Sequence, residues 1–182
     1  MVLAKYIIAL VLAVFALASC SNEKSLQKYL VDKQDDDKFL KVDIATSLLK
    51  SNDNSFTEEE NEILETIKKV NVVAYKIQDG NTADYETEKK ELAQIVGQEK
   101  YKTLMKFGSN NRGATLKYLG EEDAIDEVIV FASDNEQGFA VFRLLGDNMR
   151  PDQMIKLMNS IDNGNLDVSK LSGIGDLFNL DM

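Results

Sequence analysis

The sequence predicts an α+β domain built on a mainly antiparallel sheet of about five strands, with helices packed on one face of that sheet. Segments in which apolar and polar residues alternate, the period of a strand, are interspersed with segments whose apolar residues recur every three or four positions, the period of a helix. The last three strand-like segments follow one another without an intervening helix, which favours hairpin connections and antiparallel pairing.

The first 19 residues have the composition of an export signal. One positive charge, Lys5, precedes an unbroken apolar or small run over residues 6–18. A membrane-spanning helix needs roughly 20 apolar residues, so this run is too short to be retained and we expect it to be removed. It ends in Leu17-Ala18-Ser19-Cys20, which has the pattern of a lipobox. We therefore predict cleavage after residue 19 and lipidation of Cys20.

Cys20 is the single cysteine of the chain. An exported protein with one cysteine cannot form an internal disulfide, and lipidation explains the thiol that is left over. The alternative interpretation is a small apolar residue at the end of an ordinary signal, with cleavage elsewhere. Ser21 follows the cysteine where an inner-membrane retention signal would place Asp. We therefore expect a lipid-anchored protein of the outer membrane, on the periplasmic side rather than the cell surface.

The predicted mature chain is strongly acidic. Removal of residues 1–19 takes away Lys5 alone among the charged residues, which leaves 20 Lys and Arg against 31 Asp and Glu. This excess of negative charge opposes binding to nucleic acid and to anionic headgroups. The expected partners are the membrane, through the lipid on Cys20, and a protein of the envelope.

A polar segment separates the predicted anchor from the domain. Residues 20–38 contain Asp35-Asp36-Asp37 and only a brief helical patch around Leu26 and Tyr29, so we interpret them as a lipidated tether. The α+β domain is expected over residues 39–164. It begins with a strand over 39–44, in which Leu40, Val42 and Ile44 alternate with polar residues, and a short helix over 46–50 follows.

Capping residues and periodicity place the other elements. Thr57 and Glu60 form a capping box that starts a helix, and a strand follows over 70–77. Asp84 is predicted to cap a helix that pauses at Gly97 and resumes to residue 108, through Tyr101, Leu104 and Met105. Strands are expected over 115–119, 127–132 and 139–145, the last two joined by a hairpin loop over 134–138, and Pro151 opens a final helix.

An amphipathic C-terminal tail is expected over residues 165–182. Its large apolar residues lie beyond the last predicted helix and rarely stay exposed without a reason. Two interpretations stay open, because the tail can fold back to cover the open sheet face or can dock a partner. These apolar residues are Leu171, Ile174, Leu177, Phe178 and Leu180.

Three segments carry a resemblance to a known family: residues 42–49, the strand end Phe142-Arg143-Leu144-Leu145-Gly146-Asp147, and the helix over 154–158. Together they resemble the domain of unknown function 4252 family, whose members are small lipoproteins of Gram-negative bacteria. The resemblance covers roughly residues 39–161. It implies an α+β envelope domain, gives no catalytic residue to carry over, and hints at envelope stress or signalling through neighbouring sigma-factor regulators.

Catalytic and metal patterns are weak. Ser25-x-x-Lys28 and Ser133-Asp134-Asn135 resemble two elements of penicillin-binding serine acyltransferases, but the third element, Lys-Thr-Gly, is absent. The chain has no histidine, which excludes Ser-His and Cys-His mechanisms and leaves only oxygen ligands for a metal. The loops beginning at Asp79 and Asp162 lack the closing glutamate of an EF-hand. We predict no cofactor, no metal and no catalytic residue.

Acidic clusters at residues 58–60 and 121–127 are interpreted as a helix N-terminus and a strand entry, both solvated. The polar loop over 108–113 could bind an anion through Arg112, but it also serves as a plain turn. The leading hypothesis is therefore a non-enzymatic binding or assembly module, and the alternative is a hydrolase with carboxylate acid/base chemistry. A contiguous apolar patch would favour the first, and converging carboxylates with raised pKa values in a cleft would favour the second.

Overall fold

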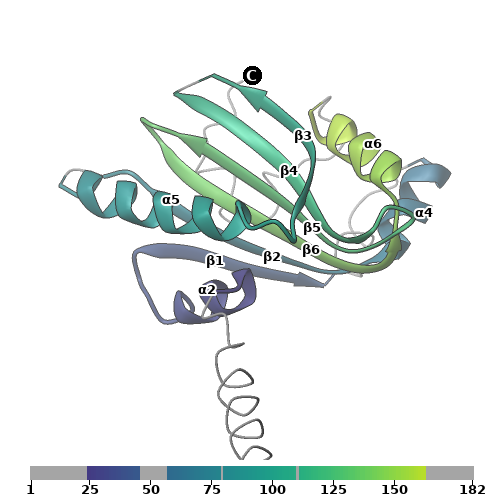
Figure 1. The fold of residues 1–182 in the computed structure, drawn as a ribbon, viewed down its shortest axis with the longest axis horizontal. Coiled ribbons are helices and arrows are strands. Elements are labelled where there is room, and N and C mark those ends of the chain that lie inside the picture. Colours follow the sequence, from purple (N-terminus) through teal and green to yellow (C-terminus); the bar gives the residue numbers. More distant parts are fainter. Residues whose placement is uncertain (1–23, 46–56, 79, 110, 163–182) are drawn as a thin grey trace, which may run out of the picture.

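The structure is a computed structural model, which describes residues 24–45, 57–78, 80–109 and 111–162. One antiparallel sheet runs through it in the order β1-β2-β6-β5-β4-β3 (Figure 1). The α+β class is confirmed, with six strands in place of about five. The strands are β1 (Phe39–Ala45), β2 (Ile67–Lys76), β3 (Lys102–Gly108), β4 (Arg112–Glu121), β5 (Ala124–Asp134) and β6 (Gly138–Met149).

Four described helices accompany the sheet. They are α2 (Leu26–Asp32), α4 (Glu58–Thr66), α5 (Thr82–Val96) and α6 (Pro151–Asp162). The capping box of Thr57 and Glu60 and the start of α6 at Pro151 are confirmed. The predicted signal, Cys20, the short helix over 46–50 and the C-terminal tail lie outside the described residues.

The sixth strand, β3, occupies the segment that the sequence predicted as the second half of a helix. The α5 helix ends at Val96 with Gly97 as its C-cap, and the chain then enters β3. β3 pairs with β4 through a hairpin in which Gly108 has a φ of 112° and approaches the Arg112 backbone. Only glycine tolerates that geometry, so the hairpin and its hydrogen bonds override the helical spacing of the apolar residues. The prediction of a helix here is wrong.

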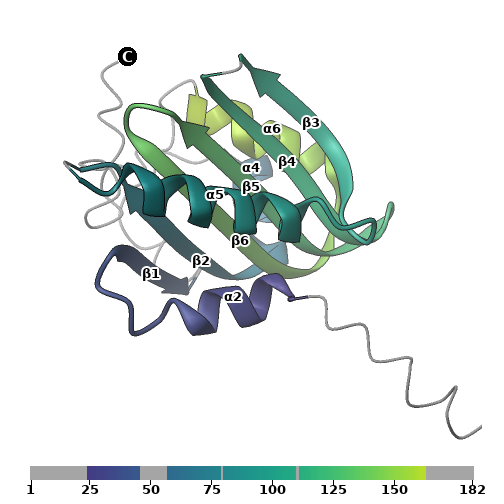
Figure 2. The same cartoon turned by 60° about the vertical axis from the view of Figure 1, so that its left-hand side comes forward.

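Helices contribute to the core on both faces of the sheet, which corrects the expectation of one covered face. Figure 2 shows α5 crossing one face while α6 lies behind the sheet. One core cluster joins residues of α4 and α6 to Val70 and Val72 of β2, and the other joins residues of α2 and α5 to Val73 and Tyr75 of the same strand. Since β2 is apolar on both sides, each face needs its own cover.

The segment interpreted as a tether contains a helix that belongs to the domain. Ser25 caps α2 by accepting a hydrogen bond from the Lys28 backbone N–H at 3.1 Å. Leu26 and Tyr29 of α2 are fully buried in the cluster shared with α5. The folded domain therefore begins before Phe39, because these two side chains fill space that the sheet alone leaves open.

The N-terminus of α5 also differs from the prediction. Asn81, not Asp84, is the N-cap residue, and the Asn81 side chain bonds the preceding turn at the Gln78 N–H and the Lys76 carbonyl. Asp84 instead lies in the first turn, where its negative charge suits the helix dipole. Its carboxylate pairs with Lys38 at 2.7 Å.

An aromatic cluster lies between the sheet and the helices α2 and α5. The Tyr75 ring stacks on Phe139 at 5.7 Å and meets Phe39 edge-on at 5.1 Å, and Tyr85 lies 6.0 Å from Phe139. The two tyrosine hydroxyls differ. Tyr85 donates a hydrogen bond to the Asp134 carbonyl at 3.0 Å, whereas the buried Tyr75 hydroxyl has no hydrogen-bond partner in the described part of the chain.

This difference predicts opposite effects for two matched substitutions. Tyr85→Phe should lower the free energy of unfolding by about 1 kcal/mol, because it removes a hydrogen bond. Tyr75→Phe should leave stability unchanged or raise it, since it removes a buried hydroxyl that gains nothing from the fold. Urea unfolding of both variants measures the contrast, and an equal loss in both would contradict the described geometry.

Candidate binding surface

The sheet face that packs against α4 and α6 is only partly covered by these two described helices. Apolar side chains of β1, β3 and β6 on this face are half-buried and pack against the buried cluster beneath them. Single exposed apolar residues are ordinary, but a continuous group of them marks a surface that can bind. We call this group the open face: Leu40, Val42, Leu104, Met105, Phe142 and Leu144.

The strand register makes the apolar surface continuous from one edge of the sheet to the other. One row across the six strands consists of Val42, Val72, Phe142, Val130, Leu116 and Met105. The row beside it consists of Leu40, Ala74, Ala140, Ala132, Ala114 and Phe107. Phe107, at the end of the second row, is 52% exposed. The central members of both rows, among them Val72, Leu116 and Ala140, are buried, so the accessible apolar surface consists of Phe107 and the half-buried side chains of the open face.

The opposite face of the sheet contains a buried ion pair that the sequence analysis did not single out. Arg143 of β6 donates from Nη2 to Glu127 Oε2 of β5 at 3.0 Å, and Arg143 Nε lies 2.9 Å from Glu127 Oε1 without hydrogen-bond geometry. The side chains are 10% and 7% exposed. Arg143 also donates to the Gln27 side chain of α2, so the pair connects the sheet to that helix.

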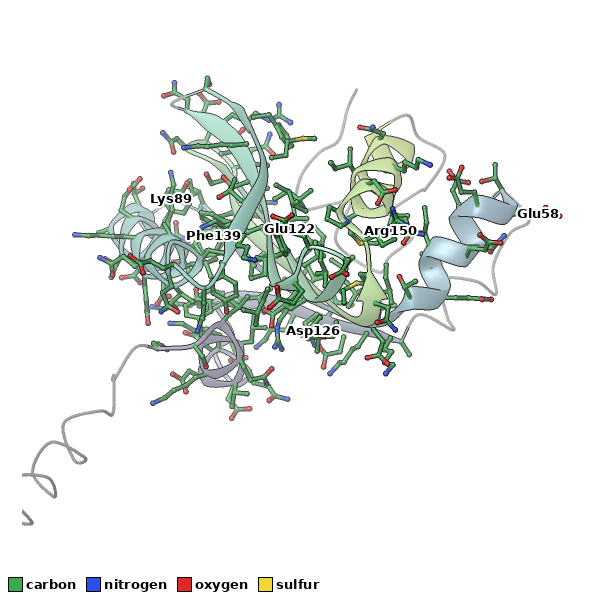
Figure 3. All side chains as sticks on the ribbon, turned by 45° about the vertical axis from the view of Figure 1, so that its right-hand side comes forward. Glu58, Lys89, Glu122, Asp126, Phe139 and Arg150 are labelled. Carbon is green, nitrogen blue, oxygen red and sulfur yellow. The ribbon has the colours of Figure 1, made fainter. Side chains whose placement is uncertain are left out.

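The acidic clusters do not converge on a common site. Figure 3 shows Glu58 at the outer end of α4, far from Glu122 and Asp126 beside the β4–β5 turn. Glu60 is used in the capping box. Glu127 is the buried partner of Arg143. A glycoside hydrolase needs two carboxylates facing one substrate, and these five residues are occupied or dispersed.

The pKa of Asp43, a carboxylate on the sheet, is lowered from its ordinary value. Burial acts to raise its pKa, but hydrogen bonds from Lys69 at 2.9 Å and from Asn71, with the Lys69 charge, outweigh that effect and lower the pKa. A general acid needs a raised pKa near the working pH. Asp43 is therefore suited to an ion pair on the sheet and not to proton donation.

The other residues weighed for chemistry have structural roles. The Ser25 hydroxyl oxygen caps α2, and the run from Ser133 to Asn135 leads into the β5–β6 hairpin. The loop over 108–113 connects two strands, and Arg112 Nε lies 3.8 Å from Asp134 Oδ2, which offsets its charge. An open depression of about 720 Å³ beside α5 is lined by that helix alone, with Glu86, Lys90 and Gln94 among its residues.

The described ranges contain no group of three or more His, Cys, Asp or Glu residues placed to hold a metal ion. No helix in that part of the chain has the length and apolar character to span a membrane.

Comparison with known proteins gives one match. A family model described as "Domain of unknown function (DUF4252)" matches residues 29–157, which include the C-terminal half of α2, all six strands and the first half of α6. No curated protein matches the chain, and no solved structure matches it. The matched range starts before Phe39, in agreement with the packing of α2 against the sheet.

The buried ion pair predicts a steep but recoverable loss of stability. Arg143→Met should lower the free energy of unfolding by roughly 3–5 kcal/mol, because it leaves the Glu127 charge buried without its partner. Adding Glu127→Leu should restore much of the loss, since no buried charge then remains. Urea unfolding measures both variants.

The control for this prediction is an exposed pair on the same face. Lys69→Met removes the partner of Asp43, whose side chain is 62% exposed, and should cost less than about 1 kcal/mol. Equal losses in the single and double Arg143 variants would show that the unpaired Glu127 charge is not the cause of the lost stability.

Proposed function

Since the chain belongs to the family of domain of unknown function DUF4252, whose description assigns no activity, we propose its function from its own sequence and surfaces. The proposal is a lipid-anchored, non-enzymatic binding or assembly module of the bacterial envelope. The observation that carries the binding role is the group of half-buried apolar side chains of the open face, on β1, β3 and β6, together with the exposed Phe107 beside them.

The anchoring half of the proposal is supported by the N-terminal sequence. Leu17-Ala18-Ser19-Cys20 ends an apolar run at the distance from the N-terminus where a lipobox acts, and it contains the chain's single cysteine. Two or three acyl chains hold a protein stably on a membrane without a spanning segment. Ser21 at the next position supports sorting to the outer membrane, on its periplasmic side.

The binding half is supported by what the open face offers to a partner. The surface combines branched aliphatic side chains, Met105, and the exposed aromatic ring of Phe107. Aromatic residues and methionine are enriched where proteins bind one another. The proposed partner is an apolar segment of an envelope protein. The tail over 165–182 is the competing occupant, and envelope signalling is one setting for such a module.

The alternative function is a hydrolase with carboxylate acid/base chemistry. Its support is weaker, because Glu58 lies far from Glu122 and Asp126, and because Glu127 is neutralised by Arg143 (Figure 3). The binding module therefore remains the preferred proposal.

Loss of the proposed acylation site should release the protein. Cys20→Ser should abolish labelling with palmitate and partition into the detergent phase, because no other thiol can accept the lipid. Metabolic labelling and phase separation measure both effects. A variant that still labels and partitions would overturn the lipoprotein assignment, and density-gradient recovery of the wild-type chain with the inner membrane would overturn the sorting.

The open face is tested by comparing two exposed apolar residues. A photo-reactive amino acid at Phe107 should cross-link a discrete envelope protein in living cells, because Phe107 borders the open face. The same group at Val31 should not, although Val31 is 53% exposed against 52% for Phe107, because Val31 lies on α2. Mass spectrometry identifies the products, and cross-linking of equal yield and identity at both positions would contradict the proposal.

A further inference from the structure

The folded domain begins very close to the predicted lipid. Lys24, four residues after Cys20, is already fixed: its carbonyl accepts a hydrogen bond from the Gln98 side chain at 2.9 Å. Its ammonium group pairs with Glu91 at 2.7 Å and with Asp32 at 3.0 Å. Four residues span at most about 14 Å even when fully extended. The connection between the lipid and the domain is therefore shorter than the α5 helix, which is about 22 Å long.

The α2 helix cannot supply further reach while it is docked. Leu26 and Tyr29 are fully buried, and Gln27 accepts from the buried Arg143. Tyr29 also donates to Glu88 of α5 at 3.3 Å, and burial together with the Glu88 charge raises the pKa of Tyr29, so its hydroxyl keeps the proton that it donates. Lengthening the connection would require the loss of all these contacts.

The attachment point selects one end of the molecule. Gln98 follows the C-terminus of α5, so Lys24 and the residues that connect α5 to β3 lie at the same end. The β5–β6 hairpin lies at the other end of α5, where Tyr85 donates to Asp134 and Lys89 donates to Asn135 at 2.6 Å. The 15 residues of α5 separate the two ends by about 22 Å. Figure 2 shows α2 starting at the end where α5 finishes.

The end of the domain that contains Lys24 carries exposed charges of both signs. Lys28, Lys100 and Lys102 are exposed there, together with Glu99 and the acidic β4–β5 turn over 121–123, since Lys102 pairs with Tyr118 near the end of β4. Lysine beside a bilayer interacts favourably with headgroup phosphates within a Debye length. The carboxylates of the 121–123 turn oppose this attraction, so the short connection to Cys20, and not the charge, selects this end.

We propose that the domain lies directly on the lipid headgroups of the bilayer that holds its acyl chains. The membrane-facing end consists of Lys24, Lys28 and residues 97–102, and the β5–β6 hairpin points away from the bilayer. This inference rests on the proposed lipidation of Cys20. In this arrangement the docked α2 helix fixes the orientation of the domain on the bilayer. The sequence alone had predicted a tether for this segment.

The test uses the lipidated mature protein reconstituted in phosphatidylcholine and phosphatidylglycerol vesicles whose headgroups carry an acceptor dye. Single-cysteine variants Lys100→Cys and Glu136→Cys carry the donor dye, since the only native thiol is acylated. Energy transfer should be roughly twofold or more higher from position 100 than from position 136, because the two ends differ by the length of α5. Equal transfer from both positions would overturn the inference.

A linker variant supplies the matched control. Twenty Gly and Ser residues inserted between Ser21 and Asn22 add an average reach of roughly 25 Å. The insertion should lower transfer from position 100 and remove most of the difference between the positions. An unchanged difference would show that the tether does not set the orientation, and would also overturn the inference.

Failure of the lipid anchor is recognised separately. A chain that is not acylated takes up dye at Cys20 itself and does not float with the vesicles, which overturns the proposed anchoring along with the inference. A chain that floats, keeps Cys20 blocked and still shows equal transfer leaves the anchoring intact and overturns only the orientation.

Discussion

The central strands of this protein are apolar on both sides, and the rest of the structure follows from that constraint. β2 sends Val70 and Val72 to one face and Val73 and Tyr75 to the other. A sheet with two apolar faces is stable only when both are covered, which a single layer of helices cannot do. Residues before the first strand are therefore drawn into the fold, and α2 covers the aromatic cluster around Tyr75 together with α5, which contributes Tyr85.

Elements that depend on local signals could be predicted from the sequence. The capping box at Thr57, the proline that opens α6 and the hairpin between β5 and β6 are each specified by residues within a few positions. β3 could not be predicted in this way, because its helical spacing is overridden by pairing with β4. The docking of α2 depends on partners more than 50 residues away, Glu88 and Arg143, which no local window contains.

The sequence could predict that a binding module has an apolar surface, but not which residues form it. A contiguous apolar patch is the expected mark of a binding module, but its members are fixed by the register that places Val42, Phe142 and Met105 in one row. The sequence gives one indication of the buried pair, because Arg143 lies between the apolar residues Val141 and Leu145 on the same face of β6. Its partner Glu127 belongs to an acidic run, and carboxylates in such runs are usually exposed to solvent.

The two edge strands, β1 and β3, determine whether neighbouring copies of the chain can associate through their sheets. An exposed strand offers unpaired backbone groups on which another chain can add itself, and proteins block this with lysines, irregular pairing or covering loops. β3 has an irregularity between Thr103 and Met105 and exposes Lys102 and Lys106. On β1, the Lys41 ammonium group holds the preceding loop by donating to the carbonyls of Gln34 and Asp36. Both edges therefore resist edge-to-edge aggregation. Many copies of the chain can lie close together and remain separate domains.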